Sequence, residues 1–387
     1  MKILAAVFNE IDYDGRVERA ATALSELGDV VVVSPSSGHA YHNGRFRNLR
    51  IHVGARRRPK LLCHLRFWSA FWWHTLRIRP DVVHAHDFFM AFPGWLAAKL
   101  VRAAFVYDAH ELIIPDADLD SSRRDAFWYY LEAWAVHRAD VVIAANRQRA
   151  LLMSRHYGLP SIPLVVRNVP PSPQATLSEG DVTTRLPFLT RSPEDAVLVA
   201  YQGVLNFQQL AVWVESLTHL PDAFRLLLIG AGAGKSELQD LVARRGLQDR
   251  VHFAGRVLRA HLNDILSCCH IGIVSYPFRG LNSLHCASNK LFEYAQAGLV
   301  IVGTSQPSIS RELERHRIGP LVNEGDGPER IAEVLREAAD DRERYRRGLA
   351  SFLSAHRWED EAGKLIDVVR GLNGRRIRSP HSGSSDQ

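Results

Sequence analysis

The sequence predicts an α/β protein made of two similar domains, each with a parallel sheet covered by helices on both faces. The 387 residues exceed the ~250–300 at which one hydrophobic core stops growing. Short β-branched runs alternate with helical stretches, and this alternation stops near residue 170 and starts again near residue 196. Continuous apolar strands separated by helices are typical of parallel sheets. We therefore expect two Rossmann-like domains that face each other across a cleft, with ligands bound at the carboxyl ends of the strands.

The first domain is assigned to residues 1–170. Its strands are expected in seven apolar runs: KILAAVF, DVVVVSP, LRIHVGA, DVVHAHD, AFVYDAHE, DVVIAAN and IPLVVRN. Residues 171–195 are rich in Pro, Ser and Thr and lack periodicity, which is typical of a linker.

The second domain is assigned to residues 196–355. Its strands are expected in AVLVAYQGV, RLLLIGA, RVHFAGR, IGIVSYP, GLVIVGT and GPLVNE. Residues 356–372 are expected to form a helix that packs back on the first domain. Residues 373–387 have the composition of a disordered tail.

Composition indicates an ordinary cytoplasmic protein. With 46% apolar and 23% charged residues the chain is close to the globular average. The apolar run at the N-terminus is too short for a signal peptide, and no apolar segment approaches the ~20 residues needed to span a bilayer. The four cysteines show neither CxxC nor zinc-type spacing, so we expect reduced thiols.

Two apparent motifs fail on inspection. In IGAGAGKSELQ a P-loop would need Gly in place of Ile229, and a dinucleotide fingerprint would need Gly in place of Lys235. Gly230 and Gly232 remain as a turn that either admits a ligand to the backbone or is purely structural. The histidines of HAHDFF and DAHEL lack the spacing of a helical zinc motif, so no metal site is expected. Their position at neighbouring strand ends indicates a polar cleft.

Residues 288–304, SNKLFEYAQAGLVIVGT, carry the most informative chemistry. Ser288 is a candidate N-cap, and a helix that starts near Asn289 presents free N–H groups to an anion beside Lys290. Glu293 lies one turn later, where its carboxylate can accept hydrogen bonds from ribose hydroxyls. A nucleotide diphosphate fits this arrangement. The alternative is a surface ion pair between Lys290 and Glu293, worth only ~0.2–0.5 kcal/mol.

The sequence resembles the GT-B glycosyltransferases of family four, a retaining group, over nearly its whole length. The resemblance rests on DGRVERAATALSELGDVVVVSP, DVVHAHD, VYDAHEL, ADVVIAAN, VVRNVP, YQGVL, LLLIGAG and RVHFAGRV, and most specifically on SNKLFEYAQAG. It implies metal-independent transfer of a sugar from a nucleotide diphosphosugar, a UDP-sugar, to an acceptor held by the first domain.

The resemblance, together with the residue patterns above, gives a set of site residues. The donor-binding candidates are Gly15, Arg16, Gly203, Gly232, Arg256, Val257, His285, Ser288, Asn289, Lys290, Leu291 and Glu293. The acceptor-side candidates are Asp87, Asp108, His110 and Glu111. The resemblance implies that Lys290 holds the diphosphate, that Glu293 binds the ribose and that His110 lies beside the acceptor and the transferred sugar; these three are the catalytic candidates. No cofactor beyond the nucleotide sugar is expected.

Two positions depart from the family pattern. His285 stands where the family carries a second Glu, which puts the choice of donor in doubt. After YQG the family carries an Arg that clamps the phosphates, whereas this chain has Gln208 and Gln209. A missing donor of this kind costs on the order of 3 kcal/mol of transition-state stabilisation in comparable sites, unless Arg256, Lys290 or Arg16 replaces it.

A basic and aromatic segment covers residues 45–79. No acidic residue occurs between positions 30 and 80. Leu61, Leu65, Trp68, Trp72 and Leu76 have helical spacing and are expected to form a core stripe. Arg66, Ser69, Trp73 and Arg77 share another face, which fits either a helix lying on anionic lipid or ordinary solvated arginines.

Three functions remain open at this point. The first is a retaining glycosyltransferase, cytoplasmic or peripheral on the inner membrane face, that acts on a glycan, lipid-linked or small-molecule acceptor. The second is a GT-B protein of weak or no activity that binds a sugar nucleotide or scaffolds a partner, as Gln208, Gln209 and His285 suggest. The third is a nucleotide-sugar epimerase of the same fold. Nucleic acid is not expected as a partner.

Overall fold

The computed structural model describes residues 1–11, 14–36, 44–53, 60–114, 123–173, 182, 188 and 195–377. The chain divides into two compact units, one formed by Met1–Asn168 with Glu359–Gln387 and the other by Val169–Trp358. Each unit contains one sheet, and every described strand pair is parallel. The predicted fold class, two Rossmann-like α/β domains, is confirmed. Most of the predicted linker lies outside the described residues.

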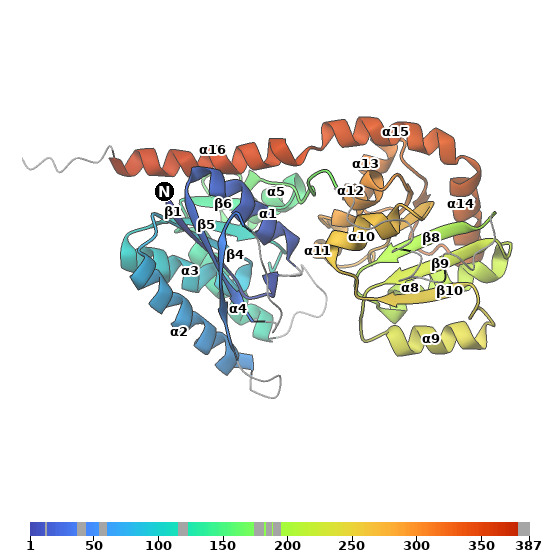
Figure 1. The fold of residues 1–387 in the computed structure, drawn as a ribbon, viewed down its shortest axis with the longest axis horizontal. Helices are drawn as coiled ribbons and strands as arrows, with labels where there is room; N and C mark the ends of the chain where they lie inside the picture. Colours follow the sequence, from blue (N-terminus) through green and yellow to red (C-terminus); the bar gives the residue numbers. More distant parts are fainter. Residues whose placement is uncertain are drawn as a thin grey trace, which may run out of the picture. The chain divides into compact units, whose positions relative to one another are not determined.

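The sheet of the first unit has seven strands in the order β3-β2-β1-β4-β5-β6-β7 (Figure 1). The strands are β1 (Lys2–Val7), β2 (Asp29–Pro35), β3 (Arg47–Ile51), β4 (Val82–His86), β5 (Ala104–Ala109), β6 (Val141–Ala144) and β7 (Leu164–Val165). The helices are α1 (Gly15–Leu24), α2 (Lys60–Ile78), α3 (Phe88–Val101), α4 (Arg123–Val136), α5 (Arg147–Tyr157) and α16 (Trp358–Ile377). The strand order reverses between β1 and β4, which is where doubly wound sheets bind ligands.

The sheet of the second unit has six strands in the order β10-β9-β8-β11-β12-β13. The strands are β8 (Val197–Gln202), β9 (Phe224–Ile229), β10 (Val251–Gly255), β11 (Ile271–Val274), β12 (Val300–Thr304) and β13 (Leu321–Val322). The helices are α8 (Phe207–Ser216), α9 (Lys235–Arg244), α10 (Arg259–Leu266), α11 (Leu281–Leu284), α12 (Asn289–Gln296), α13 (Pro307–His316), α14 (Pro328–Asp340) and α15 (Arg342–Ala355). Here the order reverses between β8 and β11, and α12 lies on the connection that leaves β11.

The C-terminal helix α16 belongs to the first unit. Leu365, Val369 and Leu372 lie in the same buried cluster as residues of β1, β2 and α1. Glu361 is fully buried and accepts hydrogen bonds from the backbone N–H and Nε of Arg167, both at 2.8 Å. The helix continues to Ile377, so the prediction that a disordered tail starts at residue 373 is wrong for its first residues. Residues 378–387 lie outside the described part of the chain.

Helix α2 buries only part of the predicted core stripe. Trp68 is buried and Trp72 is half-buried, but Leu61, Leu65 and Leu76 are 58%, 45% and 51% exposed. The buried positions are His64, Phe67, Trp68, Phe71 and Thr75. The His64 ring stacks against Phe8 and Phe89 at centroid distances of 4.1 and 5.0 Å, and this aromatic packing decides which face turns inward. Because the helix itself carries apolar residues on more than one side, spacing alone could not decide which side is buried.

No described helix is both long enough and apolar enough to cross a membrane. All four cysteines are free thiols.

Candidate active site

A buried ion pair lies at the carboxyl end of β5 in the first unit. Arg16, in the first turn of α1, donates to both carboxylate oxygens of Asp108, with Nη2–Oδ1 at 2.6 Å and Nε–Oδ2 at 2.9 Å. The guanidinium also donates to the carbonyl of Val166 at 2.9 Å. Burial would raise the pKa of Asp108, but Arg16 and the hydrogen bond with His86 hold it well below its usual range. Asp108 is therefore a carboxylate at all ordinary pH values.

This pair bears on the role expected for Arg16. From the sequence, Arg16 was expected beside the donor phosphates, where it could replace the arginine that the family carries after YQG. Its side chain is 8% exposed, and both faces of its guanidinium fork are engaged by Asp108 and Val166. In this arrangement the Arg16 guanidinium orients Asp108, and its contact with the donor phosphates stays a prediction.

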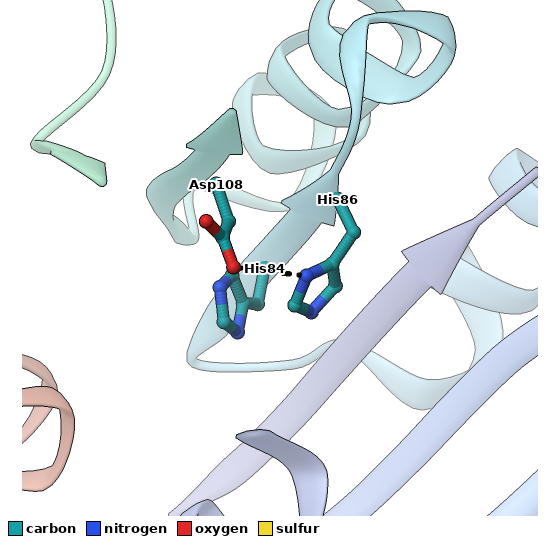
Figure 2. A group of neighbouring side chains, drawn as sticks. All are labelled: His84, His86 and Asp108. Atoms are coloured by element: carbon teal, nitrogen blue, oxygen red, sulfur yellow. Dashed lines mark ion pairs between the residues drawn. The ribbon is translucent and has the colours of Figure 1, made fainter. Parts of the chain in front are cut away.

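Three histidines gather beside Asp108. Figure 2 shows His84 and His86 on β4 with the Asp108 carboxylate facing them; His86 Nδ1 is 3.3 Å from Asp108 Oδ2. His86 Nδ1 is also 3.2 Å from His110 Nε2. Burial lowers the pKa of His84 well below its usual value and that of His110 to about 4, although the carboxylates of Asp14 and Asp108 oppose the shift at His110. His84 and His110 are therefore neutral near pH 7.

His110 is the histidine that a ligand can reach. Its side chain is 15% exposed, whereas that of His86 is fully buried. A neutral imidazole at this position can donate a hydrogen bond to a sugar hydroxyl or accept one from it, but it cannot supply a positive charge. The structure thus places His110 as a reachable hydrogen-bonding group above a buried network of His86, Asp108 and Arg16.

Asp87 and Glu111, the other acceptor-side candidates, follow β4 and β5. Asp87 has a φ of 67°, an uncommon conformation for a residue with a side chain, and its carboxylate accepts from the N–H of Phe88 at 2.8 Å as the N-cap of α3. Burial and the nearby Glu111 raise the pKa of Asp87 to about 8. Glu111 is exposed. The structure gives Asp87 a capping task, and contact of either residue with an acceptor stays a prediction.

Asp14 was missed by the sequence analysis. It is the N-cap of α1, where its Oδ1 accepts from the N–H of Val17 at 3.2 Å, and its charge acts on His110. An Asp before Gly15 at the start of a helix is a recognisable capping signal. The capping signal could have identified Asp14 as an N-cap, but it could not have shown that Asp14 lies close to His110.

Glu132 was also missed. It is 1% exposed, and its carboxyl group accepts hydrogen bonds from the hydroxyls of Tyr107 and Tyr157, the latter at 2.5 Å. Burial raises the pKa of Glu132 to about 7, although both tyrosine hydrogen bonds act in the opposite direction. No local pattern in helix α4 marks Glu132, because its two partners come from β5 and α5.

We expect Glu132→Gln to remove a pH dependence of stability. The pKa of Glu132 is about 7 in the folded chain, against 4.5 as its ordinary value, so the folded state holds the proton over this interval while the unfolded state loses it. Stability should therefore fall by about 3 kcal/mol as pH rises from 4.5 to 7. Urea unfolding of wild type and Glu132→Gln at both pH values measures the difference. Glu314→Gln, at an exposed position, is the matched control; an equal pH slope in all three proteins would contradict the assignment.

The second group of side chains lies at the N-terminus of α12 in the second unit. The Lys290 ammonium lies over the rings of Tyr201 and Tyr276, 5.2 and 4.7 Å from their centroids. No carboxylate in the described part of the chain forms an ion pair with it. Gly203 has a φ of 139°, and a Cβ there would lie 3.1 Å from Lys290 Cε. The ammonium is therefore held in place by aromatic faces without being neutralised.

The partner of Glu293 is Gln202 and not Lys290. Its Oε2 accepts a hydrogen bond from Nε2 of Gln202, at the end of β8. The surface ion pair between Lys290 and Glu293 is absent, because each side chain is engaged elsewhere. The next residue, Tyr294, is buried and its hydroxyl accepts from the N–H of Gln202 at 2.9 Å, which fixes α12 against the end of β8.

Polar atoms without partners surround the start of α12. Ser288 occupies the N-cap position and is 3% exposed, but its side chain makes no capping hydrogen bond, contrary to expectation. Ser288 Oγ and Asn289 Oδ1 are buried and have no hydrogen-bond partner in the described chain. Leu291 is buried in the core, so only its backbone can face a ligand. Buried polar atoms are normally satisfied, so a ligand or water is expected here.

The remaining donor candidates have structural environments of their own. A Cβ on Gly230 would lie 1.9 Å from the carbonyl oxygen of Gly203, and one on Gly232 would lie 2.2 Å from that of Leu205. These glycines are thus required by the close approach of two loops, which supports the structural alternative. Arg256 is exposed, and Val257 packs against the core of the unit. His285 ends the short helix α11.

The two glutamines do not replace the missing arginine. Gln209 donates from Nε2 to the carbonyl of Ser275, which ties α8 to the end of β11, and Gln208 is exposed. Among the described residues, Lys290 is therefore the cation that the structure places directly at the N-terminus of α12.

Two protein families match the two domains that carry these side chains. Residues 15–169 match the glycosyl transferase 4-like domain, and residues 197–341 match glycosyl transferases group 1. Together the two matches span well over half of the chain. The chain belongs to the GT-B glycosyltransferases. Arg16, Asp108 and His110 of this glycosyltransferase lie in the first matched domain, and Lys290 and Glu293 in the second.

Known proteins resemble this glycosyltransferase along most of its length. The D-inositol 3-phosphate glycosyltransferase of Xylanimonas cellulosilytica is 26% identical over 322 residues, which is 76% of this chain and 73% of that protein. Sucrose-phosphate synthase from Thermosynechococcus elongatus superposes with a TM-score of 0.78 at 18% identity, covering 97% of this chain and 100% of that one. Anabaena HepE in complex with UDP-glucose gives 0.69 at 15% identity, covering 98% and 100%. The two structural matches show the shared fold.

Proposed function

We propose that this glycosyltransferase moves a sugar from a UDP-sugar to a glycan, lipid-linked or small-molecule acceptor, with retention of configuration and without a metal in the chemistry. The observation that carries the proposal is the Lys290 ammonium, held over two tyrosine rings at a helix N-terminus and not paired with a carboxylate of the described chain. The relative named for D-inositol 3-phosphate and the HepE structure with UDP-glucose support the substrate class.

In this proposal the start of α12 binds the donor diphosphate. The helix N-terminus and Lys290 neutralise the phosphates, and the unpartnered Ser288 Oγ can donate a hydrogen bond to a phosphate oxygen. The unpartnered Asn289 Oδ1 can accept a hydrogen bond from a hydroxyl of the donor. Glu293 keeps one carboxylate oxygen for the ribose hydroxyls, because Gln202 occupies the other. Arg256 and Val257 flank the base, and the backbone at Gly15 approaches the phosphates.

The transfer step that we propose needs no basic side chain. The acceptor oxygen bonds to the anomeric carbon on the face that the leaving phosphate vacates. The bond between the anomeric carbon and the phosphate oxygen breaks, and the leaving phosphate takes the acceptor proton. Lys290 stabilises the charge that develops on the phosphate. His110, which is neutral, orients a hydroxyl of the transferred sugar or of the acceptor.

A turnover assay over a panel of nucleotide sugars and acceptors tests the proposal. We expect acceptor-dependent release of UDP and a product with the donor's anomeric configuration, determined by NMR. Turnover without any acceptor, with interconversion of the donor sugar, would instead identify an epimerase.

A second candidate function is nucleotide binding without efficient transfer. Gln209 is bound to Ser275 and Gln208 is exposed, so neither supplies the cation that the family places after YQG. Nucleotide binding in thermal-shift measurements combined with no transfer or hydrolysis over the whole panel would favour this function.

We further propose that the enzyme works in the cytoplasm on an anionic membrane surface through α2. The exposed apolar residues Leu61, Leu62, Leu65, Trp73 and Leu76 form two adjacent ridges along this helix. Arg66 and Arg77 are exposed among them, and Arg77 lies over the Trp73 ring at 4.1 Å. An apolar ridge beside arginines, in a region free of acidic residues, is complementary to anionic lipid. Arg56, Arg57 and Arg58 lie outside the described residues.

We expect the variant Leu61→Ser/Leu65→Ser to weaken binding to anionic vesicles. Both leucines are about half exposed, and moving the exposed half into lipid contributes about 1 kcal/mol each, or about 30-fold for the pair. Sedimentation with phosphatidylglycerol vesicles at low and high salt measures this, and high salt should release the wild type. Ile162→Ser, at another exposed apolar position of the first unit, is the matched control. Equal sedimentation of both variants would contradict the role of α2.

A further inference from the structure

A second cluster of metal-ligating side chains lies on helices α13 and α15 of the second unit. Glu312 and His316 are one turn apart on α13, and His356 is the C-cap residue of α15. Glu312 Oε2 is 2.9 Å from His356 Nε2 and 3.7 Å from His316 Nε2. The three ligating atoms all lie within 4.8 Å of one another. None of these residues belongs to the sugar-nucleotide site described above.

The two imidazoles are buried and oriented toward Glu312. His316 and His356 are 8% and 7% exposed. His316 Nδ1 is 3.3 Å from Ser351 Oγ, which can accept a hydrogen bond from Nδ1–H and so leave Nε2 free to bind a metal. Its Nε2 is buried and has no hydrogen-bond partner in the described chain, although it points toward the carboxylate.

We propose that Glu312, His316 and His356 bind a divalent transition metal ion of the zinc class. Zinc binds imidazole nitrogens and carboxylate oxygens at about 2.0–2.2 Å, so tetrahedral ligands lie about 3.3 Å from each other. The observed separations of 2.9 and 3.7 Å fall on either side of this value. Two imidazoles and one carboxylate favour zinc, cobalt or nickel over magnesium or calcium. A water molecule would complete the coordination.

The cluster in Figure 2 is the weaker metal site, although His84, His86 and Asp108 also lie within the required distance. Both carboxylate oxygens of Asp108 already accept hydrogen bonds from Arg16, at 2.6 and 2.9 Å. A metal ion there would lie against a guanidinium in a buried position and would have to displace it.

The proposed ion would brace the helix that carries the donor site. Phe352 on α15 stacks on Phe292 of α12, with ring centroids 5.5 Å apart, and His356 packs edge-on against Phe292 at 5.6 Å. A metal that joins α13 to the end of α15 would therefore fix the side chains on which α12 rests. The proposal does not depend on which sugar, if any, the protein transfers.

Metal titration of the full chain tests the proposal. The protein is first dialysed against a chelator, and Zn²⁺ or Co²⁺ is then added. We expect one equivalent of Zn²⁺ to raise the melting temperature, and one equivalent of Co²⁺ to give the visible absorption of a four-coordinate ion. His316→Gln should bind Co²⁺ more than about 100-fold more weakly, beyond the usual effect of losing an outer-shell partner. His219→Gln, at an exposed position, is the matched control and should bind as wild type.

Several outcomes would overturn the proposal. They are no thermal or spectroscopic response in wild type, an unchanged affinity in His316→Gln, or loss of binding in His84→Gln with His316→Gln unaffected. If His316→Gln does not fold, Glu312→Gln takes its place, because it removes the ligand charge at a more exposed position and keeps the shape of the side chain.

Discussion

Replacing Lys290 with alanine is expected to lower kcat by about 10²–10³-fold, because the phosphate charge that develops as the sugar leaves would lose its nearest cation. Affinity for UDP should fall by about 10–100-fold, the usual effect of losing a charged hydrogen-bond donor. The two tyrosine rings that hold the ammonium can remain packed when the side chain is truncated. Steady-state kinetics and calorimetric titration with UDP measure the two effects separately.

Lys235 provides a matched control for this experiment. It is also a lysine at the start of a helix in the second unit, and it follows the glycine-rich loop that resembles a P-loop. Lys235→Ala should leave UDP affinity and kcat close to wild type, since the glycines of that loop are explained by packing against Gly203 and Leu205. If Lys290→Ala bound UDP as well as wild type, or if Lys235→Ala lost binding instead, the donor site would have to be moved away from α12.

The fold was predictable because its signal is local. Each buried strand is a short apolar run, and both sheets are parallel, so the alternation of strands and helices follows directly along the chain. Helix α12 begins at Asn289, where the SNK sequence predicted it. The assignment of Lys290 and Glu293 to one ligand rests on local spacing and on the family resemblance, and it stays a prediction. These predictions required no knowledge of what packs against what.

The errors arise where a residue's role depends on a distant partner. The contact of Arg16 with the phosphates stays a prediction, but its ion pair with Asp108, 92 residues away, was not foreseen. The leucines of α2 were expected in the core, but aromatic rings of Phe8, which follows β1, and of α3 and α4 pack against His64 and select an adjacent face. Glu132 is buried by two tyrosines from other elements. Local periodicity contains no information on such contacts, because they are set by tertiary packing.

Replacing Arg16 with methionine is expected to destabilise the first unit by about 3–5 kcal/mol, the usual cost of leaving a buried charge without its partner. The Asp108 side chain is 4% exposed, so water cannot replace the guanidinium. Burial then acts without opposition from Arg16 and should raise the pKa of Asp108. Urea unfolding monitored by a probe in the first unit measures the loss.

The cause of this loss can be separated from simple loss of packing. If it is the uncompensated charge, the double variant Arg16→Met/Asp108→Asn should be more stable than Arg16→Met alone, because the second change removes the stranded carboxylate. The pH dependence of the stability difference between wild type and Arg16→Met also tests whether the uncompensated charge is the cause. The pKa of Asp108 is depressed in the folded wild type, so the stability this pair contributes is present above the ordinary pKa of 3.8 and is lost as pH falls through the lower folded value. The gap between wild type and Arg16→Met should therefore narrow in acid. A double variant that is no more stable than Arg16→Met, with a gap independent of pH, would show that the guanidinium acts through its contact with Val166 and its packing alone.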